Sequence, residues 1–139
     1  MTVTWNHRVA VAVLALLLAA CGSFRAPDEL GRYPVTLVAV ERVSSGVLGP
    51  RNVAARTVAP DVIHVLREHQ HHVGLVAHEL RHIVQWNEHG PGYLIAYNAQ
   101  VATHGYHDAP YEVDARAAEM DPWYRAWARD VIAAHAEAP

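Results

Sequence analysis

The segment that decides the fold runs from Val73 to Trp86 and reads VGLVAHELRHIVQW. Its apolar residues recur at offsets of three and four, which is the pattern of one buried stripe on an α-helix. At about 100° per residue, His78 and His82 lie about 40° apart on the side away from this stripe, with Glu79 on their flank. The pattern therefore predicts a helix that buries one side in a core while its two imidazoles point together into a cleft.

The spacing His-Glu-x-x-His suits a zinc ion. Two imidazole nitrogens one turn apart can reach the same Zn²⁺ at roughly 2.0–2.1 Å. With a third protein ligand, the fourth position stays open for a water whose pKa falls to about 7, and Glu79 can take its proton. This is the division of labour in zinc metallopeptidases. Chance gives roughly 0.05 matches to this pattern in a chain of 139 residues with 11 His. The alternative is a His-rich surface helix whose side chains contact only water.

The first 20 residues have the organisation of an export signal. His7 and Arg8 form a short basic region, and residues 9–20 are an unbroken apolar run. This run is shorter than the roughly 20 residues of a membrane-spanning helix. The sequence LAACG that ends at Gly22 resembles the lipobox of bacterial lipoproteins. The resemblance implies cleavage before Cys21 and lipidation of that residue.

This resemblance also implies a location in the cell. We expect residues 1–20 to be a lipoprotein signal peptide, residues 21–33 a lipid-anchored tether, and residues 34–139 one domain. The domain would be held at the cell envelope on the extracytoplasmic side. In a Gram-negative host, Gly22 rather than Asp after the cysteine favours the outer membrane. Cys21 is the only cysteine, so no intramolecular disulfide and no Cys-based metal site can form. The alternative is an ordinary secreted protein with a stray cysteine.

The charge of the chain argues against nucleic acid as a partner. All 11 basic residues are Arg. Removal of Arg8 with the signal peptide leaves ten of them against 14 acidic residues, without any basic run. We therefore expect the lipid, rather than a basic patch, to hold the protein to the membrane.

Apolar and β-branched stretches before the central helix predict three short strands, at residues 34–42, 52–58 and 61–66. Helical spacing and turn residues after it predict helices at residues 93–103, 111–120 and 123–135, and Trp123, Trp127 and Val131 would form the buried stripe of the last one. We therefore expect an α+β domain in which a short β-sheet packs on the His-Glu-x-x-His helix, with two or three further helices. The strand nearest that helix would flank the cleft, where an extended peptide could pair with it.

A third zinc ligand must come from elsewhere in the chain. The metzincin pattern requires Gly and His three and six residues after the second His, and Gln85 and Glu88 stand there instead. The other candidates in the later part of the chain are Glu112, Asp114, His104 and His107.

The segment PYEVDAR at residues 110–116 resembles the Glu-x-(Glu/Asp)-Ala segment that follows His-Glu-x-x-His in small bacterial gluzincin-like peptidases. The resemblance covers residues 73–86 and 106–118. It implies a zincin-like fold, with His78 and His82 as zinc ligands, Glu112 as the third ligand and Glu79 as the general base.

The chain departs from this family at one position. Relatives often place an Asp four residues after the ligand Glu, where it orients the first His, and this chain has Arg116 there. Asp114 or Glu119 could take over that role.

The sequence thus predicts a lipid-anchored zinc metallopeptidase-like hydrolase with one Zn²⁺ per chain and a peptide or protein substrate. Candidate donors to the oxyanion on the scissile carbonyl are Tyr97, Tyr106, His107 and Tyr111. The alternative is a non-catalytic zinc-binding lipoprotein that acts as a binding or structural module. Just before the central helix stand three further histidines, which indicate either a solvated helix start or a second metal site: His69, His71 and His72.

Overall fold

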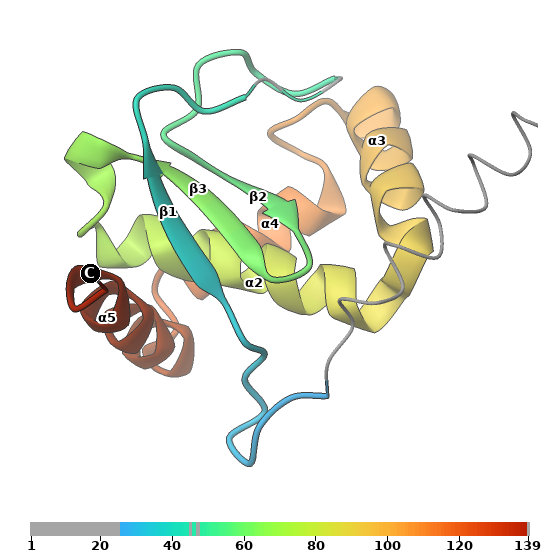
Figure 1. The fold of residues 1–139 in the computed structure, drawn as a ribbon. Helices are drawn as coiled ribbons and strands as arrows, with labels where there is room; N and C mark the ends of the chain where they lie inside the picture. Colours follow the sequence, from blue (N-terminus) through green and yellow to red (C-terminus); the bar gives the residue numbers. More distant parts are fainter. Residues whose placement is uncertain (1–25, 45, 47, 139) are drawn as a thin grey trace, which may run out of the picture.

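The computed structural model describes residues 26–44, 46 and 48–138 (Figure 1). The signal peptide, Cys21 and the first part of the tether lie outside these residues and remain predictions. The described chain is an α+β domain, as the sequence predicts, with a three-stranded sheet and four α-helices. Within the same residues, no helix is both long enough and apolar enough to span a bilayer.

The sheet consists of β1 (Thr36–Val40), β2 (Ala55–Ala59) and β3 (Val62–Leu66), in the order β1-β3-β2. The central strand β3 runs parallel to β1 and antiparallel to β2, so β2 is an edge strand. All three strands fall at or near their predicted positions. The second was predicted to end at Val58 but includes Ala59, which pairs with Val62 across an irregularity in the register.

Helix α2 (Val73–His89) crosses one face of this sheet (Figure 1). The other helices are α3 (Tyr93–His104), α4 (Pro110–Ala118) and α5 (Pro122–Ala136), and short 3₁₀ turns lie at Arg67–His69 and Gly90–Gly92. Helices α4 and α5 both pack against α2, and α5 also contacts β1. Helix α2 was predicted to end at Trp86 but continues to His89. It ends where Gly90 adopts φ 62°, a conformation that glycine tolerates better than other residues.

The core forms between the sheet and the predicted apolar stripe of α2. Ile63 and Val65 of β3 are fully buried, and so are Val76, Leu80 and Ile83 of α2. The alternation of β3 places its two residues on one face of the sheet, and the offsets of the α2 residues place them on one side of the helix. The polar side of α2 is thereby directed toward α4.

One core prediction is wrong. Trp123, expected in the buried stripe of α5, is 37% exposed, whereas Trp127 is 4% exposed. The reason is the position of Trp123 in the first turn of α5, where its backbone N–H donates to the Asp121 side chain. There its ring packs edge-on against Trp127 and lies under the guanidinium of Arg32.

Candidate metal centre

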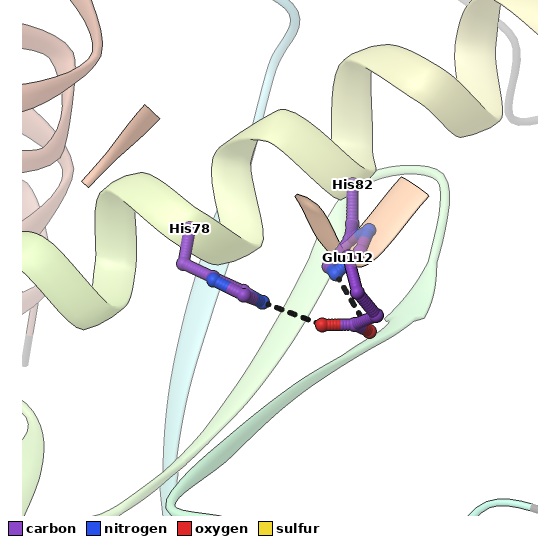
Figure 2. Close-up of side chains that lie close together, drawn as sticks. All are labelled: His78, His82 and Glu112. Atoms are coloured by element: carbon purple, nitrogen blue, oxygen red, sulfur yellow. Dashed lines mark ion pairs between the residues drawn. The ribbon is translucent and has the colours of Figure 1, made fainter. Parts of the chain in front are cut away.

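The two histidines of α2 and the glutamate of α4 meet in the interior of the protein (Figure 2). His78 Nε2 lies 3.2 Å from Glu112 Oε2, and His82 Nε2 lies 3.3 Å from Glu112 Oε1. The residues are 8%, 5% and 2% exposed. Glu112 stands in the first turn of α4, after Pro110, so the proline that starts this helix also fixes where the carboxylate projects.

These three side chains could hold a metal ion. Each side chain offers one ligand atom, and these atoms all lie within 4.8 Å of one another. Two ligands of a tetrahedral ion at 2.0–2.1 Å lie about 3.3 Å from each other, and each histidine nitrogen has one oxygen of Glu112 at that separation. Glu112 Oε2 is buried and makes no hydrogen bond among the described residues, and it pairs there with His78 Nε2 at 3.2 Å. A buried carboxylate needs a positive partner, which either a protonated His78 or a cation between the three side chains would supply.

Without a metal ion, the same groups form a charged cluster. Burial opposes the charged form of His78, but the surrounding carboxylates of Glu112, Glu79 and Glu119 outweigh it and raise its pKa to about 9. Burial opposes the charged form of Glu112 too, but the two histidines hold its pKa well below the usual value. The Tyr97 hydroxyl donates to Glu112 Oε1 at 2.7 Å. The carboxylate is thus kept ionised, as a metal ligand must be.

Each histidine is oriented through its other ring nitrogen. His78 Nδ1 donates to Glu119 Oε1 at 2.9 Å, and His82 Nδ1 donates to Gln85 Oε1 at 2.8 Å. Because carboxylate and amide oxygens can only accept, both Nδ1 atoms carry a proton. The Nε2 atoms, which face Glu112, are then the ones left to bind a metal.

The amide of Gln85 is itself held in place. Its Nε2 donates to Tyr111 O at 3.1 Å and to Asp114 Oδ2 at 2.9 Å, which fixes the amide oxygen toward His82. Asp114 also accepts from Arg81 Nε at 2.6 Å. Asp114 therefore supports His82 through Gln85.

Glu119 thus contacts the first His of the pair, the role for which the sequence left Asp114 and Glu119 as candidates. It lies seven residues after Glu112 rather than four, just beyond the last turn of α4. The sequence offered Glu119 as one of two candidates to orient the first His, and it did not predict the role of Gln85. The i, i+3 spacing from His82 to Gln85 on one helix was the available signal.

Glu79 lies beside the metal-binding group and is tied to the edge strand. Thr57 N–H donates to Glu79 Oε2 at 2.7 Å, and the Thr57 hydroxyl donates to the same oxygen at 2.8 Å. Both hydrogen bonds go to Oε2, so Oε1 is left for a water molecule. A pocket of about 70 Å³ contacts Glu79, His82 and Glu112, and offers space for that water.

The structure places the remaining candidate oxyanion donors and metal ligands either in the pocket or away from it. Tyr97 and Tyr106 line the pocket, whereas Tyr111 and His107 do not. His104 and His107 are exposed, so neither joins the buried group.

The histidines before α2 have other surroundings. The His72 ring accepts the Leu75 N–H at 2.9 Å and caps the helix, and His71 is exposed. In the part of the chain that the structure describes, these residues form no further group that could hold a metal ion.

Comparison of the chain with models of known families, with curated proteins and with solved structures finds no match.

Proposed function

We propose that this protein is a zinc-dependent metallopeptidase-like hydrolase with a zincin-like arrangement of the gluzincin kind. The observation that carries the proposal is the convergence of two imidazole nitrogens on one buried carboxylate next to Glu79. His78, His82 and Glu112 would hold the ion, because a donor set of two nitrogens and one carboxylate suits Zn²⁺ with one position open. When bound, the ion would supply Lewis acidity toward a water and a carbonyl oxygen.

Glu79 is placed to manage the proton. Its Oε1 can accept a proton from the attacking water and pass it to the leaving amine nitrogen, as a general base that becomes a general acid. The two hydrogen bonds from Thr57 hold the other oxygen, so the carboxylate keeps one orientation through both transfers.

Tyr106 is the better placed of the two pocket tyrosines to stabilise the oxyanion. The Tyr97 hydroxyl donates to Glu112 at 2.7 Å, so its proton is committed. Tyr106 is half-buried in the pocket wall, and burial together with the nearby carboxylates of Glu112 and Glu79 raises its pKa above the usual value. It therefore stays protonated and can donate a hydrogen bond to the developing charge.

We further propose that lipid on Cys21 holds this domain to the envelope on the extracytoplasmic side, where it acts on a peptide or protein. A second candidate function is a non-catalytic zinc-binding module. Two observations favour it. Glu79 already accepts two hydrogen bonds from Thr57. The pocket is about 70 Å³, less than half of the roughly 150 Å³ that accommodates a benzene molecule.

One substitution separates these functions. Glu79→Gln is expected to retain one zinc per chain and to lose hydrolysis of a peptide library, since an amide cannot take up the proton. Glu88→Gln is the matched control, because Glu88 lies on the same helix and is exposed. The metallopeptidase proposal fails if the zinc-loaded wild type hydrolyses nothing, or if Glu79→Gln is as active as Glu88→Gln.

A further inference from the structure

Arg56 has no role in the mechanism above, although it lines the catalytic pocket. It precedes Thr57 on the edge strand β2. It also lines a second hollow of about 280 Å³, which is bordered by Ser44, Gly46 and Gly49 on one side and by residues of α3 on the other. Thr57, Leu94 and Tyr97 border both hollows as well. Arg56 therefore stands where a ligand would pass from the metal-binding group across the edge strand.

The Arg56 side chain is half-buried, and its guanidinium is incompletely partnered. Its Nε is buried and has no hydrogen-bond partner among the residues that the structure describes. No acid in those residues forms an ion pair with it. A buried charged donor without a partner is unfavourable unless something binds it.

Neighbouring backbone positions it beside the pocket. The guanidinium packs directly on Gly46. Arg56 NH2 and the Tyr106 ring each lie 3.8 Å from the place where a Cβ on Gly49 would be. Arg56 and the proposed oxyanion donor thus flank the same glycine, Gly49.

The charges in the pocket favour an anionic ligand. This step rests on the proposed function. Glu79 and Glu112 bring two negative charges, and a Zn²⁺ ion would balance them. Arg56 then leaves the pocket with one positive charge in excess. In a partly buried site this excess attracts a negatively charged group.

We propose that Arg56 is a specificity-determining residue that binds a substrate carboxylate next to the scissile bond. The planar guanidinium suits a carboxylate, which it can bind through two parallel hydrogen bonds. The carboxylate can belong to a free C-terminus or to an acidic side chain. In either case the enzyme selects acidic substrates.

Zinc-chelating hydroxamates test this without requiring turnover. We would measure the dissociation constants of two matched pairs by calorimetry on the zinc-loaded protein. In the first pair, the hydroxamate is followed by an alanine with a free carboxylate or with a terminal amide. In the second pair, it is followed by Glu or Gln in a chain blocked at its end. The variants are Arg56→Gln and Arg56→Lys, and Arg51→Gln is the control because Arg51 is exposed and outside the pocket.

The wild type is expected to bind the carboxylate member of one pair about tenfold more tightly than the neutral member, as a charge-assisted hydrogen bond predicts. The pair that shows the preference identifies its source, terminal or side-chain. Arg56→Gln should bring the ratio close to one, Arg56→Lys should keep part of it, and Arg51→Gln should keep all of it.

Three outcomes would overturn the inference. In the first, the wild type binds the carboxylate and the neutral member of each pair with equal dissociation constants. In the second, Arg56→Gln keeps the preference of the wild type for the carboxylate member. In the third, Arg51→Gln loses as much of this preference as Arg56→Gln does. If all four hydroxamates bind the zinc-loaded protein but neither pair shows a preference for its carboxylate member, only the role of Arg56 is refuted. If no hydroxamate binds at all, the proposed zinc centre is refuted together with it.

Discussion

Replacement of Glu119 by Gln probes how the metal-binding group is held together. Glu119 does not belong to the proposed ligands. Its Oε1 accepts a hydrogen bond from His78 Nδ1 at 2.9 Å and thereby orients Nε2 toward Glu112. The substitution removes the negative charge while it preserves the size of the side chain. If the account is correct, zinc affinity falls although all three ligands remain.

The structure sets the size of this effect. Loss of such a partner generally lowers metal affinity by 10–100-fold. The Glu119 side chain is 42% exposed, so water screens its charge and can replace its hydrogen bond in part. We therefore expect the lower end of the range, about tenfold, or about 1.4 kcal/mol. A smaller opposite effect arises because Glu119 also helps to raise the pKa of His78, and its removal weakens competition by protons.

The assay is competition for zinc against a chromophoric chelator of known affinity, at neutral pH and constant ionic strength. Glu137→Gln is the matched control, because it makes the same change of charge at an exposed site at the end of α5. The reasoning is refuted if Glu119→Gln binds zinc as tightly as the wild type. It is also refuted if Glu137→Gln loses as much affinity, since the effect would then be one of overall charge.

Three further predictions concern protons and packing. The pKa of His78 is raised to about 9, so zinc must displace a proton from this residue at neutral pH. Apparent zinc affinity should therefore increase as the pH rises toward 9. Calorimetry in buffers of different ionisation enthalpy would measure the proton release. The raised pKa of His78 means that its protonation stabilises the metal-free fold fully below pH 6.5, and that this stabilisation is lost as the pH rises through 9. The denaturation midpoint of the metal-free protein should therefore fall between pH 6.5 and 9. A midpoint that does not change over this interval would contradict the placement of His78. Leu80→Ala, at a site with 0% exposure, should lower the free energy of unfolding by about 2–5 kcal/mol in urea titrations. Leu30→Ala, at 62% exposure, should change it by less than about 0.5 kcal/mol, and equal losses would show that the core has been misplaced.

Helix α2 shows how much of this architecture could be read from local patterns. Its apolar offsets alone identify the side that packs on the sheet, and its two histidines follow on the opposite side. The strands were predictable for a similar reason, since β-branched residues cluster between turn residues. Their order was not, because pairing of β3 with both β1 and β2 depends on contacts between segments far apart in sequence.

The surroundings of the histidines were only partly predictable. The position of Glu119 depends on where α4 ends and how that end lies against α2, and no local pattern encodes this. Gln85 could have been found from its spacing to His82, but the support that it receives from Asp114 comes from another helix. Arg56 gave no signal at all, because a single arginine in a strand is usually a solvated side chain.

The proposed function requires that His78, His82 and Glu112 bind one metal ion. The most direct measurement is the metal content, by native mass spectrometry, of the chain from residue 22 onward, expressed without a histidine tag, with and without Glu112→Gln. We predict one zinc ion per wild-type chain and loss of that ion in the variant, because a buried amide cannot replace the carboxylate. A folded wild-type chain without metal, or a variant that retains a full equivalent of zinc, would contradict the account.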